Sequence, residues 1–353
     1  MEFIYTGILI LLILQFLKNN NRLSHTTLCF YLFLYLFLAS ALKSPHLTGD
    51  LVSYSNTFSK LHNETYETFF QRWLNGAQKD PTFYAFAKLL SSVGVNIWGW
   101  FAVIAMLFAA SVTHIIKKYS PIPFISCLAL VSLEIFGFSM SGLRQTMALS
   151  FICFAYPFIL ERKLKNYLLC MLMAWAFHSS ALVFLPVYWL GSYRIGAKQI
   201  MILAICVGLC VLVPSLIRNS LGNLAWNESI ANYQYQKSSL TWSGFIIQAS
   251  IFAFCFFYRH SVTKNKINIL TICLNCMAIG LCFQAMASII AEAFRAAYYY
   301  NLCNIIAIPI VIAAQQKHRD RVIMAFAISA LLFLYMLWKQ AYFDFIYCWE
   351  QNI

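Results

Sequence analysis

The sequence contains little charge: only 10% of its 353 residues are Asp, Glu, Lys or Arg, whereas about 25% is usual in soluble globular chains. Because 61% of the residues are apolar and the mean hydropathy is +0.69, the remaining polar residues are too few to cover a water-facing surface. This composition excludes a soluble fold. It predicts an integral membrane protein.

Acidic residues are scarcer still, with 12 Asp and Glu against 25 Lys and Arg and a net charge of +13. In a soluble protein, such an excess would suggest nucleic acid or an acidic substrate as partner. In a membrane protein, basic residues instead concentrate in short cytoplasmic loops. We therefore expect the positive charge to orient the helices and expect no nucleic-acid partner.

The sequence also lacks the motifs of a metal or redox site. It has no DxD motif, and its CxxC pair, Cys273 and Cys276, lies inside an apolar run with no second pair or His at ligand spacing. Most of the 12 Cys lie in apolar runs, where Cys is a small buried hydrophobic residue. We expect no metal, no cofactor and no disulfide framework. The run from Phe3 to Leu17 lacks a basic leader and a cleavage site, so it is expected to be a retained first span.

Apolar runs long enough for membrane helices recur along the chain. They centre on 3–17, 27–42, 96–116, 122–140, 143–160, 166–191, 199–217, 242–259, 267–290, 296–314 and 322–338. The run 166–191 is either one long helix or two short helices broken at Phe177-His178-Ser179-Ser180. A break places the basic clusters on one side, as the positive-inside rule requires. These clusters are Lys18/Arg22, Lys117/Lys118, Arg162/Lys163/Lys165, Arg194/Lys198, Arg259/Lys264/Lys266 and Lys317/Arg319/Arg321.

We therefore predict an all-α polytopic membrane protein with about 12 transmembrane helices in a single integral membrane domain, 1–353. Both termini and the two long polar loops, 43–95 and 218–241, are predicted to face outward. The segment from Pro81 to Val93 is too short for a span and is expected to form an interfacial or re-entrant helix capped by Asp80.

Charged residues in or beside the spans are functional candidates, because charge that faces lipid costs several kcal/mol. Apart from Glu134, inside the fourth span, they lie at three outer helix ends near 139–146, 177–180 and 290–296. These candidates are Arg144, Gln145, His178, Glu292 and Arg295.

Each charged candidate also has a purely structural explanation. Arg144 could extend to the outer headgroups, and His178 could only cap a helix. Glu292 and Arg295 have the i, i+3 spacing of a local ion pair. Glu134 could be neutral and hydrogen-bonded between helices.

The two outer loops combine carboxylates and cations with aromatic residues. The first contains Asp50 and Tyr54, and the second contains Arg218, Tyr233 and Tyr235. Aromatic faces stack on sugar C–H surfaces and carboxylates bind hydroxyl groups. The loops are therefore candidates for a carbohydrate site.

The order of four segments resembles the EpsG-like and Wzy-type polysaccharide polymerases over residues 45–190. These segments are Asp50 with Tyr54, Asp80-Pro81-Thr-Phe-Tyr, Gly142-Leu-Arg-Gln-Thr-Met-Ala-Leu-Ser, and Ala176-Phe-His-Ser-Ser-Ala-Leu-Val-Phe-Leu-Pro. Where such proteins often have Glu-Pro, this chain has Asp80-Pro81. The resemblance implies a multi-pass enzyme of the bacterial inner membrane that polymerises repeat units of an O-antigen or capsule at the periplasmic face.

The implied donor and acceptor are undecaprenyl-diphosphate-linked oligosaccharides, with membrane lipid and a chain-length regulator protein as further candidate partners. Cleaving a glycosyl diphosphate leaves negative charge that a metal or fixed cations must stabilise. Without a metal motif, arginine is the expected ligand of the diphosphate. We therefore predict a metal-independent glycosyltransferase.

The predicted roles divide the candidate residues into three groups. Arg144 and Arg295, with Arg218 as a third candidate, bind the diphosphate. His178, or alternatively Asp50, takes the proton of the acceptor hydroxyl. The remaining candidates bind substrate: Tyr54, Gln145, Tyr233, Tyr235 and Glu292.

Three other functions remain open at this stage. A flippase for the same lipid-linked unit would need polar groups near the membrane midplane, and an O-antigen ligase would differ only in its acceptor. A structural anchor would not require Arg, His and Glu at one face.

Overall fold

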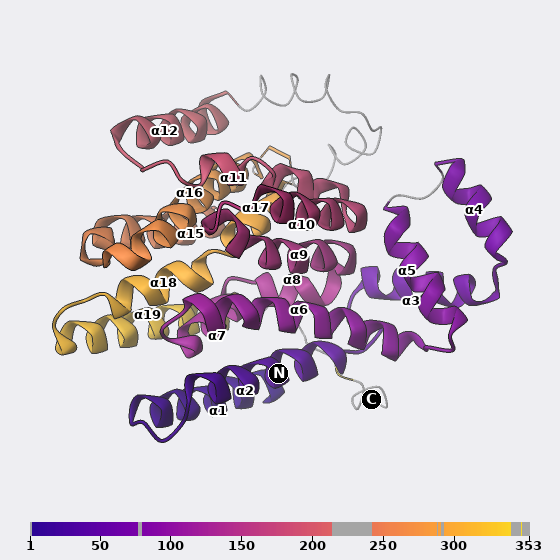
Figure 1. Cartoon of the computed structure of the whole chain (residues 1–353), viewed down its shortest axis with the longest axis horizontal. Helices are drawn as coiled ribbons and strands as arrows, with labels where there is room; N and C mark the ends of the chain where they lie inside the picture. The colour runs from indigo at the N-terminus through magenta and orange to yellow at the C-terminus, as the bar shows by residue number, and fades with distance from the viewer. Residues whose placement is uncertain are drawn as a thin grey trace. The chain divides into compact units, whose positions relative to one another are not determined.

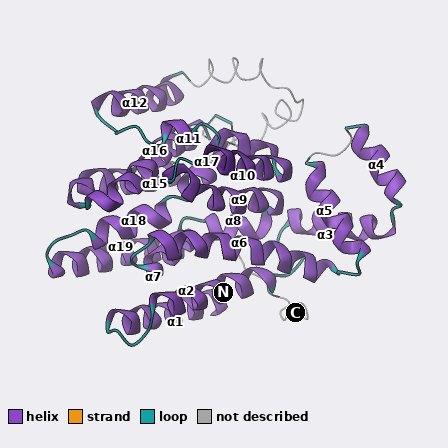
Figure 2. Ribbon diagram, in the orientation of Figure 1, coloured by secondary structure: helices purple, strands orange, loops and turns teal. Residues whose placement is uncertain are grey.

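The computed structural model describes residues 2–76, 80–213, 242–287, 289–290, 293–339 and 347. Over these residues the regular secondary structure is helical (Figure 2). The only β-type pairing among them is an isolated antiparallel bridge between Lys43 and Tyr347. The predicted all-α fold is confirmed. The chain forms two compact units, Met1–Leu185 with Lys317–Ile353, and Pro186–Gln316. The prediction of a single domain stays a prediction.

The first unit contains the helices of the N-terminal half and the last helix of the chain (Figure 1). They are α1 (Glu2–Asn19), α2 (His25–Ala41), α3 (Gly49–Asn63), α4 (Tyr66–Leu74), α5 (Pro81–Ser92), α6 (Ile97–Tyr119), α7 (Pro123–Ser132), α8 (Ile135–Ser141), α9 (Leu143–Leu160), α10 (Leu164–Phe177), the 3₁₀ helix η1 (Ser179–Phe184) and α19 (His318–Lys339).

The second unit contains the helices between η1 and α19. They are α11 (Val187–Leu190), α12 (Ala197–Leu212), α15 (Ser243–Phe257), the 3₁₀ helix η3 (Tyr258–Ser261), α16 (Lys264–Met286), α17 (Ala293–Asn301) and α18 (Asn304–Ala313). Inside this unit, a buried amide pair joins α15 to α18, with Asn304 Nδ2 donating to Gln248 Oε1 over 2.7 Å.

Several helices are long and apolar enough to cross a membrane. Among the described residues they are α1, α6, α9, α16, the α17–α18 segment and α19, with α7 and α8 as a seventh if that bent pair is one span. Only 11% of the apolar window of α19 and 22% of that of α1 is buried. Apolar helices so exposed need lipid around them, so the predicted polytopic membrane protein is confirmed. Four shorter apolar helical segments also occur within the described ranges, and the total of about 12 spans stays a prediction.

The predicted break at 177–180 is confirmed. Helix α10 ends at Phe177, and η1 begins at Ser179 after an extended residue, His178. The hydroxyl of Tyr167, in the first turn of α10, donates to the backbone carbonyls of Phe184 and Leu185 over 2.9 and 3.1 Å. Because η1 ends beside the beginning of α10, the chain reverses direction at His178.

Basic residues from separate segments meet at one end of the first unit. Lys18 donates to the carbonyl of Pro121 over 2.9 Å, and Lys118 and Lys163 pair with Glu161 over 3.1 and 2.8 Å. The 18 residues of α9 separate this end from the α8–α9 turn, a distance of about 27 Å at 1.5 Å per residue. That length is close to the thickness of a hydrocarbon core.

Helices α3, α4 and α5 cover the opposite end of the first unit, beyond the ends of α6 and α9 (Figure 1). An apolar cluster holds them there, in which the ring of Phe58 stacks on Trp100 at a centroid distance of 5.0 Å. Lys88 of α5 is 5% exposed, and its ammonium donates to the carbonyls of Leu61 and Glu64 at the end of α3. The last carbonyls of a helix otherwise lack partners, so Lys88 fixes α3 against α5.

The predicted fourth span is interrupted. Helices α7 and α8 meet at an angle of 59°, and Glu134 at the break has φ 63°, in the left-handed region. Its carboxylate pairs with Lys339, the last residue of α19, over 3.4 Å. Glu134 was expected inside a continuous span, but it lies at the break and has a cationic partner.

Candidate functional site

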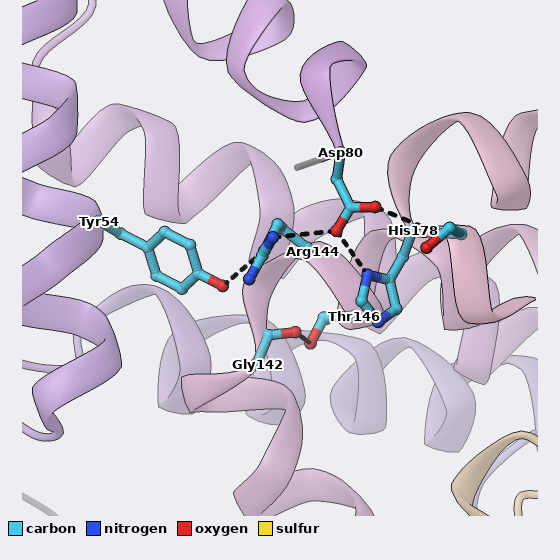
Figure 3. A network of polar contacts seen from close by, with 7 residues as sticks. Tyr54, Asp80, Gly142, Arg144, Thr146 and His178 are labelled. Atoms are coloured by element: carbon cyan, nitrogen blue, oxygen red, sulfur yellow. Dashed lines mark hydrogen bonds and ion pairs between the residues drawn. The ribbon is translucent and has the colours of Figure 1, made fainter. Parts of the chain in front are cut away.

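The site is built around one carboxylate, that of Asp80 (Figure 3). Its Oδ2 accepts hydrogen bonds from Nη1 of Arg144 over 3.0 Å and from Nδ1 of His178 over 2.8 Å. Its Oδ1 accepts the backbone N–H of Ser179 over 3.2 Å. The guanidinium of Arg144 also donates through Nε to the hydroxyl of Tyr54 over 3.2 Å. Three of the four segments in the family resemblance therefore meet at Asp80, and Tyr54 supplies the fourth.

The expectation that Asp80 caps α5 is wrong. Asp80 stands at the N-cap position, before Pro81, but its side chain makes no capping hydrogen bond to α5. Its φ of 55° is in the left-handed region, which Asp tolerates better than most residues. This conformation costs about 1–3 kcal/mol and persists only where neighbouring contacts fix it. Here the contacts with α9, His178 and η1 fix it, so the carboxylate receives the first N–H of η1 instead of an N–H of its own helix.

Arg144 lies in the first turn of α9, where the helix dipole disfavours a cation. The turn before it is tight because a Cβ at Gly142 would lie 2.6 Å from Cζ of Phe138. Thr146 holds the turn by donating its hydroxyl to the carbonyls of Ser139 and Gly142, each over 3.0 Å. The helix itself gives no electrostatic reason for an arginine, so the carboxylate of Asp80 supplies the compensating charge.

Tyr54 is held by other aromatic rings. Its ring makes edge-to-face contacts with Phe83 of α5 and Trp100 of α6, at centroid distances of 5.6 and 6.3 Å. Only 7% of the residue is exposed. This packing on α3 places the phenol oxygen opposite the Nε of Arg144.

The ionisation of Asp80 assigns the tautomer of His178. Burial alone would raise the pKa of Asp80, but the hydrogen bond and the charge of His178, the charge of Arg144 and the N–H of Ser179 hold it below its ordinary value. An ionised carboxylate only accepts hydrogen bonds. Nδ1 of His178 must therefore carry a proton, which in the neutral imidazole leaves Nε2 with a free electron pair.

This arrangement supplies a proton acceptor beside a cation. The side chains of Arg144 and His178 are 24% and 13% exposed, whereas that of Asp80 is 3% exposed. The carboxylate is therefore covered, while part of each of the other two side chains remains accessible. With a neutral His178, the charges of Arg144 and Asp80 cancel, and protonation of the imidazole adds one positive charge.

The other predicted site residues lie outside this hydrogen-bonded group or cannot be placed. Asp50 is exposed in the first turn of α3, one turn before Tyr54. Gln145 is 3% exposed in α9, beside Arg144. Arg295 is exposed in α17 of the second unit, with its guanidinium carbon 5.9 Å from the centroid of the Phe294 ring. Four of the predicted residues lie outside the described residues: Arg218, Tyr233, Tyr235 and Glu292.

Among the described parts of the chain, no group of three or more His, Cys, Asp and Glu side chains could hold a metal ion. The ion pair of Glu134 and Lys339 is a second polar site, with side chains 28% and 21% exposed.

Sequence reasoning predicted roles for Arg144, His178 and Tyr54 but missed Asp80. The available signal was the Asp80-Pro81 segment of the family resemblance. Asp80 was interpreted only as the cap of the helix that begins at Pro81.

Comparison with known proteins identifies the family. No curated protein and no solved structure matches the chain significantly. The model of the EpsG family matches residues 26–349, which is nearly the whole chain and includes every member of the Asp80 group. The chain therefore belongs to the EpsG family, and this membership supports a general role in polysaccharide polymerisation by glycosyl transfer.

Proposed function

We propose that the protein polymerises undecaprenyl-diphosphate-linked oligosaccharide repeat units by glycosyl transfer at the periplasmic face of a bacterial inner membrane. The observation that carries this proposal is the convergence of Arg144 and His178 on the carboxylate of Asp80. A partly exposed guanidinium beside an imidazole combines a ligand for a diphosphate with a base for a hydroxyl group. The product is a longer chain of an O-antigen or capsule.

The transfer requires one bond to form and one to break. The acceptor hydroxyl oxygen attacks the anomeric carbon of the donor, and the electron pair of the cleaved C–O bond leaves with the undecaprenyl diphosphate. Nε2 of His178 takes the hydroxyl proton, and Arg144 stabilises the charge that develops on the diphosphate. The proposed reaction uses these two side chains and requires no metal ion.

The position of the basic residues supports the proposed orientation. Lys18, Lys118 and Lys163 gather at one end of the first unit, and the Asp80 group lies at the other end of α9. Since basic residues favour the cytoplasmic side, the site then faces the periplasm. Lipid-linked repeat units would reach it from the outer leaflet.

The proposal is tested in cells that depend on this gene for surface polysaccharide. Arg144→Gln and His178→Gln should each reach the membrane at the normal level yet reduce the polysaccharide ladder to single repeats. Removing a general base typically lowers the rate about 10²–10⁴-fold, enough to abolish long chains. The measurement is gel analysis of surface polysaccharide, together with a membrane immunoblot.

Matched controls replace residues of the same type outside the site. Arg22→Gln, in the α1–α2 turn, and His62→Gln, in the last turn of α3, are both exposed and should leave the ladder unchanged. Normal-length chains from Arg144→Gln or His178→Gln would remove that residue from the mechanism.

A flippase for the same lipid-linked unit is the second candidate function. The observation in its favour is the ion pair of Glu134 and Lys339 at the break between α7 and α8, because transporters often bind substrate or coupling ions at broken helices. Loss of a flippase traps lipid-linked units on the cytoplasmic side, whereas loss of a polymerase leaves single units outside. Labelling the units from the periplasm in a deletion strain therefore separates the two functions.

A further inference from the structure

A single oxygen atom of Asp80 serves both working groups of the site. Oδ2 accepts from Nη1 of Arg144 over 3.0 Å and from Nδ1 of His178 over 2.8 Å, while Oδ1 is occupied by the N–H of Ser179. The carboxylate side chain is 3% exposed, so water cannot readily replace either partner. Arg144 and His178 therefore compete for the same negative charge.

The competition changes when His178 takes up a proton. A neutral imidazole offers Asp80 an ordinary N–H, whereas an imidazolium offers a charge-assisted hydrogen bond that is roughly twice as strong. The imidazolium also cancels the charge of the carboxylate, so the guanidinium of Arg144 is no longer neutralised. Its charge then becomes available to an anion on its accessible side.

We infer, on the basis of the proposed function, that Asp80 is a positioning residue that couples proton uptake at His178 to release of Arg144 toward the departing diphosphate. Before transfer, Asp80 restrains the guanidinium and holds Nδ1–H so that Nε2 faces the acceptor hydroxyl. During transfer, the hydroxyl proton reaches Nε2 while the C–O electron pair reaches the diphosphate. The positive charge on the site thus rises at the moment when negative charge appears on the leaving group.

The charged and titratable groups around the Asp80 carboxylate come from several elements. His178, and Arg144 of α9, act on Asp80 directly, Tyr54 of α3 and Tyr84 of α5 act on Arg144, and Arg72 of α4 acts on Tyr84. Carboxylates, phenols and guanidinium groups ordinarily keep their charge between pH 6 and 8, whereas imidazoles titrate there. Comparison of wild type with His178→Gln therefore isolates the contribution of the imidazole to any pH effect on diphosphate binding.

The experiment measures binding of farnesyl diphosphate, a soluble prenyl diphosphate, to the purified full-length protein in nanodiscs, together with its polymerising activity. Asp80→Asn removes the negative charge but keeps the size of the side chain. It should bind farnesyl diphosphate about fivefold or more tightly than wild type at pH 8. The same variant should polymerise about 100-fold or more slowly, because an amide does not stabilise the imidazolium.

This opposite pair of effects separates positioning from a purely structural role, which would weaken both binding and activity. Asp80→Glu, which keeps the charge, should restore weak binding at pH 8. The matched control is Glu67→Gln, an exposed carboxylate in the first turn of α4, which should change neither quantity. Equal or weaker farnesyl diphosphate binding by folded Asp80→Asn at pH 8 would overturn the inference.

A second arm covers the case in which Asp80→Asn does not fold. Wild type and His178→Gln are compared at pH 6 and pH 8, so that titration of the ligand itself cancels between them. Wild type should gain about fivefold or more in affinity at pH 6 relative to His178→Gln, and identical pH responses would overturn the coupling. Unchanged binding by Arg144→Gln would instead refute the diphosphate site of the proposed function, a different failure from loss of coupling.

Discussion

Removal of the Asp80 carboxylate tests how strongly the site is held together. Asp80→Ala leaves the guanidinium of Arg144, the imidazole of His178 and one backbone N–H without their shared acceptor. For two unit charges about 4 Å apart, the attraction is about 4 kcal/mol at an effective dielectric constant of 20. Breaking a buried ion pair by removing one partner costs about 3–5 kcal/mol. Because the Arg144 side chain is 24% exposed, we expect about 3 kcal/mol.

The assay is a double-mutant cycle of Asp80→Ala and Arg144→Ala. Free energies of unfolding are measured by titrating the purified protein with SDS in mixed micelles and following the fluorescence of its nine Trp residues. The double variant should be less destabilised than the sum of the single variants by about 2 kcal/mol, because it leaves no unpaired guanidinium behind.

The matched control cycle uses Arg72 and Glu64, an ion pair at 2.8 Å with side chains 35% and 12% exposed. Because this pair is more exposed on its cationic side, its coupling energy should stay below about 1 kcal/mol. A coupling energy for Asp80 and Arg144 as small as that of the control would refute the conclusion that the carboxylate fixes the arginine.

Three further predictions concern the surroundings of the site. Gly142→Ala should destabilise the protein by about 1–3 kcal/mol, because its Cβ would lie 2.6 Å from Phe138 Cζ, and the same SDS titration measures this loss. Lys88→Met should leave the carbonyls of Leu61 and Glu64, at the end of α3, without the ammonium donor. Backbone amides of α3 should then exchange with deuterium faster by an amount equivalent to about 1–3 kcal/mol, and unchanged exchange would contradict the role of Lys88. The folded-state pKa of Asp80 is lowered. Its stabilising contribution should therefore be complete above the ordinary aspartate pKa of about 3.9 and be lost as pH falls below that value. The stability difference between wild type and Asp80→Asn should shrink only in that acid range.

The helical fold and the reversal at His178 could be predicted because both depend on signals spread along the whole chain. Low charge and long apolar runs indicate membrane helices, and the positive-inside rule requires a break in the run 166–191. The short helix from Pro81 was also predicted, since the segment is apolar but too short to span a membrane. Composition and charge asymmetry were sufficient for each of these features.

The role of Asp80 could not be predicted by the same reasoning. Its partners Arg144 and His178 are 64 and 98 residues away in sequence, whereas the capping rule considers only the next three residues. The break at Glu134 was missed for a related reason, because the apolar run 122–140 continues through it and Lys339 lies more than 200 residues further along. Contacts made only in the folded chain decided both cases.

The most direct measurement is polymerisation by the purified protein in proteoliposomes, with lipid-linked repeat units extracted from a strain that lacks the gene. Wild type should convert single repeats into a ladder of long chains. His178→Gln should bind farnesyl diphosphate but leave the repeats single, because no group takes the acceptor proton. Long chains formed by His178→Gln at the wild-type rate would contradict the assignment of catalysis to the Asp80, Arg144 and His178 site.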